Sequence, residues 1–439
     1  MSASVQTVRE PASTRTRARD VTARVPETAV ARAALGVVAL HIADDSFFQP
    51  QPGTSASDHL ISGLVPIGVL GLAAWAYPKL RPGLRAILAL LFGTFGIITG
   101  VEAVYYTTKG GPSGDDFTGL LALVAGIVLL GVGAVTLWRS RKTTGSRVWR
   151  YTRRVLLAVG GLAVVYLVVF PLSLSYIFTH VARGFVPTPE LGTAYEDVSF
   201  ATSDGLELEG WYIPSRNRAA VIAFPGRSGP QRPARMLARH GYGVLLFDRR
   251  GEGESDGDPN VFGWKGARDV RAAVEYLRGR ADVDPERIGG IGLSVGGEMM
   301  IEAAADSDGL AALVSDGAGI RSIREALAIP DTRKRIEATV AHAIVTPATA
   351  IFSNSLPPQS LEDLSARIAP TPVLFIYTVP GQGGEAELTE AFHAAAREPK
   401  DVWLVPGAGH TGGIEARPDE YERRVVGFFD EALLGGSSD

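Results

Sequence analysis

Apolar runs that are long enough to cross a lipid bilayer occupy most of the first 180 residues of this chain. A bilayer core of roughly 30 Å requires a helix of about 20 mostly apolar residues. Four runs approach that length, and they lie at about 59–77, 86–107, 117–138 and 155–178. A shorter fifth run, 29–43, carries Arg32 and His41. We predict an all-α membrane region over residues 28–180, with about five transmembrane helices in contact with the lipid bilayer.

The basic residues of the loops predict the orientation of these helices, since Lys and Arg are retained on the cytoplasmic side of a membrane. The loop after the second run carries three, and the loop after the fourth run carries seven: Arg139, Arg141, Lys142, Arg147, Arg150, Arg153 and Arg154. By contrast, 44–58 has three Asp and no Lys or Arg. Five spans place the N-terminus in the cytoplasm and the chain after Phe178 outside it. Without the run at 29–43, the N-terminal arginines would lie on the wrong side.

Residues 1–27 are rich in Ser, Thr and Arg and have little apolar surface to bury, so we predict a disordered cytoplasmic arm. The run after this arm lacks a small-residue cleavage site ahead of polar sequence, which argues against a secretory signal peptide. The formal net charge of −4 gives no general attraction to nucleic acid. The chain has no cysteine, and its seven histidines show no H-x-x-H or HExxH spacing. We therefore predict neither a metal site nor a cofactor.

From about residue 195, short β-rich runs alternate with amphipathic helical patterns, which is typical of an α/β sheet. The first two runs, 198–201 and 206–213, are expected to form a hairpin. We predict a linker at 181–194 and one α/β domain at 195–435. The segment at about 319–368 is longer than an ordinary crossover and mostly helical, so we expect a cap insert over a site.

A serine between glycines, in Gly292-Leu293-Ser294-Val295-Gly296, joins an expected strand to a helical pattern. The glycines permit a sharp turn that strains the serine backbone and exposes its Oγ. The N–H of Val295 would lie at the helix N-terminus, where an anion is stabilised. Such a pattern also arises by chance in a glycine-rich chain. The preceding strand, the following helix, and the acid and histidine downstream favour a nucleophile elbow.

Three blocks of this domain resemble the α/β-hydrolase superfamily, most of all its dienelactone-hydrolase and peptidase-like branches. They are the turn from Asp248-Arg249-Arg250-Gly251, the elbow with its lead Val283-Asp284-Pro285, and the late Gly407-Ala408-Gly409-His410-Thr411-Gly412-Gly413. The resemblance covers about 195–435. It implies an α/β-hydrolase fold, in which helices flank a mostly parallel sheet, and the activity of a serine hydrolase fused to a multi-span membrane region.

The resemblance also implies a Ser-His-acid triad. Ser294 would be the nucleophile, which needs a base to remove its proton, and His410 on a glycine-rich loop would be that base. The family usually places an Asp after the strand that ends near Tyr377, but this chain has none there. Glu385 is preferred as the acid, because the neighbouring glycines allow its loop to reach the imidazole. Asp316, just past the preceding strand, is the alternative acid.

Two N–H groups would form the oxyanion hole in this family. The first belongs to Val295, and the second comes from the loop after the strand that ends at Phe224. The usual His-Gly is here Pro225-Gly226, so the donor by alignment is Arg227. The Arg227 side chain could also hold an anionic substrate group, although a surface arginine is the simpler interpretation.

These residues predict a membrane-anchored serine hydrolase that cleaves an ester or thioester, from a small-molecule or peptide acyl substrate, through an acyl-enzyme. A membrane-bound serine peptidase is the first alternative. The second is a non-catalytic membrane interaction or transport-accessory protein that retains the hydrolase fold for binding. Such a protein has no need of an intact Ser, His and acid, so their presence favours an enzyme.

Overall fold

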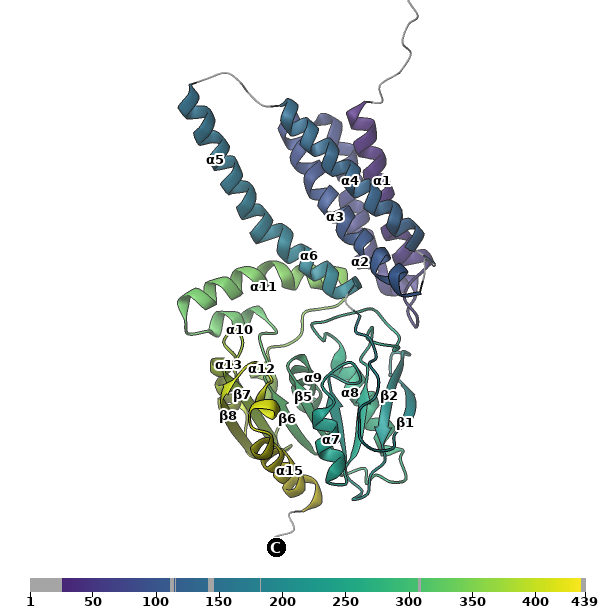
Figure 1. Ribbon diagram of the computed structural model, residues 1–439, viewed down its shortest axis with the longest axis vertical. Helices are drawn as coiled ribbons and strands as arrows, with labels where there is room; N and C mark the ends of the chain where they lie inside the picture. The colour runs from purple at the N-terminus through teal and green to yellow at the C-terminus, as the bar shows by residue number, and fades with distance from the viewer. Residues whose placement is uncertain are drawn as a thin grey trace, which may run out of the picture.

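The computed structural model describes residues 26–110, 114, 116–140, 146–181, 183–306 and 309–435. Long helices form a bundle at one end, and an α/β domain lies at the other (Figure 1). The predicted disordered arm falls outside the described residues, apart from its last two. Residues 141–145 of the predicted basic loop also lie outside them.

The N-terminal region is helical throughout its apolar runs, because a helix satisfies its own backbone hydrogen bonds without water. Its helices are α1 (Glu27–Ala43), α2 (Leu60–Ala76), α3 (Pro82–Gly110), α4 (Asp116–Arg139), α5 (Arg147–Val164) and α6 (Phe170–Tyr176). Within the described chain, four segments are long and apolar enough to cross a membrane: Ala56–Lys79, Pro82–Thr108, Asp116–Arg139 and Arg147–Val181. The last of these joins α5 and α6. Helix α1 has 17 residues and is not one of the four, so the fifth span stays a prediction.

Close contact between α3 and α4 holds the centre of the bundle. At Gly126 of α4, an added Cβ would lie 2.7 Å from the backbone nitrogen of Ile97 on α3. Small residues of this kind let two membrane helices approach until their backbones touch. Helix α1 packs lengthwise against α2 and α4, with Leu35 and Val38 buried between them.

The α/β domain is built on one eight-stranded sheet with the order β1-β2-β4-β3-β5-β6-β7-β8. Its strands are β1 (Glu196–Ala201), β2 (Glu207–Ile213), β3 (Ala220–Phe224), β4 (Gly243–Phe247), β5 (Ile288–Leu293), β6 (Ala312–Asp316), β7 (Val373–Pro380) and β8 (Lys400–Ala408). The predicted hairpin is β1 and β2, and β2 also pairs antiparallel with β4. All other pairs are parallel, which confirms the predicted α/β-hydrolase architecture.

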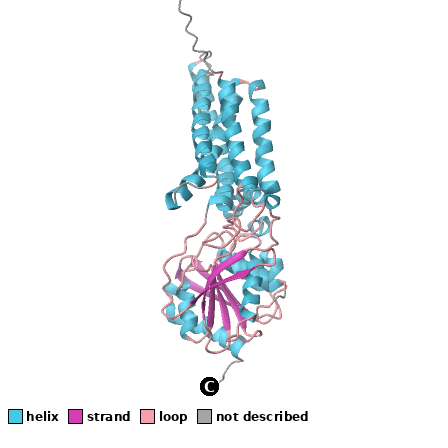
Figure 2. Ribbon diagram, turned by 90° about the vertical axis from the view of Figure 1, so that its right-hand side faces the viewer, coloured by secondary structure: helices cyan, strands magenta, loops and turns pink. Residues whose placement is uncertain are grey.

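Helices cover both faces of this sheet (Figure 2). One core cluster joins the sheet to α8 (Gly266–Arg278), α9 (Val295–Ala305), α12 (Leu361–Ser365) and α13 (Glu385–Ala395). The other joins it to α7 (Arg232–Arg239) and α15 (Pro418–Leu434). Every side chain of β3 and β4 is buried, as expected for strands covered on two sides. Full burial of each large apolar side chain contributes about 1.5–3 kcal/mol.

The predicted cap insert contains α10 (Ile323–Ala328), α11 (Thr332–Phe352) and the core helix α12. Helix α11 lies across the end of the bundle and packs against α6 (Figure 1). One hydrogen bond of this contact runs from the Ser175 hydroxyl on α6 to the Val345 carbonyl on α11. The cap therefore lies between the sheet and the helical bundle.

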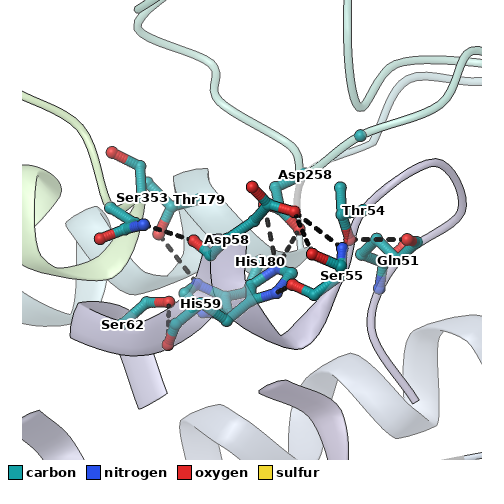
Figure 3. A network of polar contacts seen from close by, with 12 residues as sticks. Gln51, Thr54, Ser55, Asp58, His59, Ser62, Thr179, His180, Asp258 and Ser353 are labelled. Carbon is teal, nitrogen blue, oxygen red and sulfur yellow. Dashed lines mark hydrogen bonds and ion pairs between the residues drawn. The ribbon is translucent and has the colours of Figure 1, made fainter. Parts of the chain in front are cut away.

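Polar contacts fasten the bundle to the α/β domain (Figure 3). His59 Nε2, at the start of α2, lies 3.0 Å from Asp258 Oδ1 in the loop after β4. The Gly257 N–H donates to the Pro52 carbonyl at 2.9 Å. Arg183, in the predicted linker, donates to the carbonyls of Ser255 and Gly257. The acidic segment 44–58 and the α/β domain therefore lie at the same end of the bundle, whereas α4 ends and α5 begins at the other end.

Candidate active site

The predicted elbow is a sharp turn between β5 and α9. Ser294 is the single residue between them, and its φ of 54° and ψ of −125° lie outside the regions that a serine normally adopts. Gly292 cannot carry a side chain here, because an added Cβ would lie 2.3 Å from the carbonyl carbon of Gly296. The sequence therefore folds locally into a strained turn that keeps the Ser294 side chain accessible.

His410 reaches Ser294 from the loop that follows β8. Its Nε2 lies 2.9 Å from Ser294 Oγ, and its Nδ1 lies 2.7 Å from Glu385 Oε2. The strands β5, β7 and β8 thus bring three side chains into one hydrogen-bonded row at the carboxyl edge of the sheet. The structure brings together the three residues that the sequence singled out as nucleophile, base and preferred acid.

Glu385 is the first residue of α13, and its carboxylate is fixed by several donors. The Thr378 N–H and hydroxyl donate to Oε1 at 2.8 and 2.9 Å, and the Gln382 N–H donates to Oε2 at 3.2 Å. Burial disfavours the charged form, but the hydrogen bonds from His410 and Thr378 outweigh burial and hold the Glu385 pKa below its usual value. In turn, the hydrogen bond to Glu385 outweighs burial and raises the pKa of His410.

Asp316, the alternative acid, lies at the end of β6 with a different set of partners. Its Oδ2 accepts a hydrogen bond from the Tyr421 hydroxyl at 2.9 Å, and its backbone carbonyl accepts one from the Ser294 N–H. Burial, only partly offset by the Tyr421 hydrogen bond, raises the pKa of Asp316 to about 7. Within the described residues, Glu385 rather than Asp316 is the carboxylate that hydrogen-bonds His410.

Arg227, the predicted second oxyanion donor, is buried, and both its N–H and its side chain have partners in the structure. Its N–H donates to Asp248 Oδ1 at 3.2 Å, and its guanidinium is buried in ion pairs with Asp248 and Glu254. Asp248 follows β4, which pairs with β3, so its carboxylate lies directly beside the loop that carries Arg227. The side chain is therefore not available to hold a substrate anion. Val295 has its N–H in the first turn of α9, where intrahelical acceptors are absent.

A cavity lies beside the elbow, and most of the residues that line it carry no motif in the sequence. It lies between the start of α9 and α11, and its lining includes Trp264, Val295, Arg321 and Thr349. Arg321 and Thr349 belong to the cap insert, where no motif marks them. The long helical insert itself was the only sequence signal that a covered site exists. In the described chain, no cluster of three or more His, Asp or Glu is arranged to hold a metal ion.

Residues 187–335 match the family described as X-Pro dipeptidyl-peptidase (S15 family). An uncharacterized protein of Mycobacterium tuberculosis is 37% identical over 224 residues, which cover 49% of this chain and 73% of the relative. The uncharacterized protein YfhR of Salmonella typhi is 26% identical over 299 residues, covering 65% of this chain and 98% of the relative. An esterase of Pyrococcus furiosus superposes with a TM-score of 0.49 at 24% identity, covering 59% and 99% of the two chains.

Proposed function

This chain belongs to the α/β-hydrolase superfamily, and we propose that it is a membrane-anchored serine esterase that cleaves an ester or thioester through an acyl-enzyme. The observation that carries the proposal is the hydrogen-bonded row of Ser294, His410 and Glu385. These three groups have the spacing and order that nucleophilic acyl transfer requires.

In the proposed mechanism, Ser294 Oγ attacks the substrate carbonyl while His410 Nε2 takes the serine proton. Glu385 accepts the Nδ1–H of His410 and stabilises the imidazolium that forms. The Val295 N–H, in the first turn of α9, stabilises the oxyanion. His410 then protonates the leaving alcohol or thiol. Water, activated by His410, attacks the acyl-enzyme and releases the acid.

The Arg227 N–H can act as the second oxyanion donor only after its hydrogen bond to Asp248 breaks. Catalytic hydrogen bonds often tighten only once substrate is bound, so such an exchange is compatible with the free enzyme described above. The site then has one preorganised donor, Val295, and one donor that must be released.

Active-site labelling tests the proposal. The full-length protein in detergent should react with a fluorophosphonate probe and hydrolyse small 4-nitrophenyl esters, and Ser294→Ala should abolish both. Ser199→Ala, at an exposed position on the outer strand β1, is the matched control and should retain both. Near-normal ester hydrolysis by Ser294→Ala would exclude Ser294 as the nucleophile.

A second candidate function, a peptidase, is favoured by the family match at 187–335. That match ends before Glu385 and His410, so it does not decide whether the enzyme cleaves an ester or a peptide bond. A panel of X-Pro 4-nitroanilides compared with 4-nitrophenyl esters separates the two functions. Turnover of the anilides at rates that match or exceed those of the esters would favour the peptidase.

We also propose that the α/β domain is extracytoplasmic. The basic residues at the C-terminal end of α4 and the N-terminal end of α5 favour the cytoplasmic side. These two helix ends lie at the end of the bundle that is far from the α/β domain (Figure 1). The acidic segment 44–58 contacts the α/β domain through the carbonyls of Pro52 and Asp58, as expected for two parts on the same side of the membrane.

A further inference from the structure

Helix α11 of the cap carries an exposed apolar stripe, which consists of Ile336, Val340, Ala343 and Pro347. These residues follow one another at steps of three or four, which places them on one face of the helix. Ile336 is 58% exposed and Val340 is 39% exposed. The outer face of a helix in water normally carries polar and charged side chains, so this apolar stripe indicates contact with something other than water.

The other face of α11 is turned toward the α/β domain. Four residues of the helix line the cavity beside the elbow: His342, Val345, Thr346 and Thr349. At about 3.6 residues per turn, these positions lie on roughly the opposite side of the helix from Ile336 and Val340. The apolar stripe therefore points away from the α/β domain, toward the side on which the bundle lies (Figure 1).

Packing places α11 beside the last apolar segment of the bundle and not beyond its end. The helix contacts α6 and also η4 (Val165–Val169), and both belong to the apolar segment Arg147–Val181. Every residue of these two elements falls inside the predicted span at 155–178. Exposed apolar side chains, such as Phe170, cover this part of the segment. With the proposed membrane anchoring, α11 therefore lies at the depth of the bilayer surface, next to a lipid-facing helix.

The charged residues of α11 are gathered at its N-terminal end. Arg333, Lys334 and Arg335 lie in the first turn, and the side chains of Arg333 and Lys334 are exposed. Long basic side chains beside an apolar face can reach lipid headgroups while their stems stay in the interface. Arg333 pairs with Glu337, and Lys334 Nζ lies 4.0 Å from Glu387 Oε1, so this end has little excess charge. The contact with lipid is therefore mainly apolar, through the stripe.

We propose that α11 is an interfacial helix, which lies in the membrane leaflet nearest the α/β domain with its apolar stripe against lipid acyl chains. This inference rests on the proposed membrane anchoring and adds a lipid contact outside the spans. Helices of this kind lie in the plane of the membrane, with the apolar face roughly 5–10 Å into the boundary between headgroups and acyl chains. One face of α11 then contacts lipid, and the other lines the cavity beside the elbow.

Spin labels test the inference, since the chain has no cysteine of its own. Ile336→Cys and Val340→Cys each carry a nitroxide on the full-length protein in phosphatidylcholine vesicles. Electron paramagnetic resonance then measures how often the label collides with oxygen, which concentrates in lipid, and with nickel-EDDA, which stays in water. The ratio of oxygen to nickel accessibility should be severalfold higher at both positions than at Arg324→Cys. Arg324 is the matched control, because it is exposed on α10 of the same cap and pairs with Asp363 on the core helix α12.

Two reference positions separate this inference from the proposed anchoring. Leu162→Cys, on an exposed part of the predicted last span, supplies the lipid ratio, and Thr193→Cys, exposed in the predicted linker, supplies the water ratio. A water-like ratio at 336 and 340 beside a lipid-like ratio at 162 overturns the inference alone. A water-like ratio at 162 as well overturns the anchoring. Labels at 336 that neither reagent reaches, and that couple magnetically to one another, mean that a second copy covers the stripe, which also overturns the inference.

Discussion

Glu385 and Asp316 are two buried carboxylates near one histidine, and their partners assign them different roles. Glu385 accepts hydrogen bonds from Thr378, Gln382 and His410, which favour its charged form. Asp316 has one side-chain donor, Tyr421, and is buried with a raised pKa. A charged carboxylate can stabilise an imidazolium during the reaction, whereas a protonated one cannot.

We therefore expect Glu385→Gln to lower kcat/KM by roughly 10²- to 10⁴-fold, since the amide no longer stabilises the charged imidazole. Asp316→Asn should cost far less, within about tenfold, because Asp316 supports the elbow through its backbone carbonyl, which the substitution retains. Steady-state kinetics on a 4-nitrophenyl ester measures both. The reverse ranking would make Asp316 the acid.

The pH dependence of the reaction gives a second prediction for the same residues. The neutral imidazole of His410 is the base, so kcat/KM should fall as pH drops through the His410 pKa. Glu385 raises the pKa of His410, so the acidic limb of the profile lies at higher pH than it would for an unperturbed histidine. Glu385→Gln removes the carboxylate that raises the His410 pKa. The acidic limb of the variant's residual activity should therefore lie at lower pH. A limb that stays in place would mean that another group titrates.

At the scale of single elements, the elbow depends on the close approach of β5 and α9. Gly292→Ala would place a methyl group 2.3 Å from a backbone atom of Gly296. We expect a loss of stability of roughly 2–4 kcal/mol, measured as a lower thermal midpoint, together with a loss of fluorophosphonate labelling. Gly427→Ala on α15 is the control, because an added Cβ there meets nothing within 4 Å. It should leave the midpoint unchanged or raise it.

Elements of the α/β domain could be predicted from the sequence because each has a local cause. The strands are short apolar runs, and Gly292 and Gly296 mark the turn that holds Ser294. Arg227 could not be placed in the same way, since its N–H donates to Asp248, 21 residues later in the turn after the neighbouring strand β4. The same limit applies to α11, which contacts α6 about 170 residues away through Ser175 and Val345. Such contacts depend on how whole elements assemble.

For the molecule as a whole, we predict that the α/β domain lies outside the cytoplasm and that the loop between α4 and α5 lies inside it. The chain has no cysteine, so a single introduced cysteine is the only thiol that can react. One variant carries it at Ser146, which precedes the basic first turn of α5, and the other at the exposed Thr193 before β1. An impermeant maleimide applied to intact cells should label position 193 and not position 146. Permeabilised cells, where both should react, provide the control. Labelling at 146 alone would place the α/β domain in the cytoplasm.

The carboxyl edge of the sheet faces the helical bundle, because the loop after β4 contacts α2 and the cap helix α11 lies against α6. If the bundle spans a membrane, as proposed, Ser294 is held a fixed, short distance from the lipid headgroups. Molecules dissolved or concentrated in the membrane surface would meet the enzyme by diffusion in two dimensions. Turnover would follow the mole fraction of substrate among the lipids, and a large folded protein in free solution would be excluded by the bilayer itself.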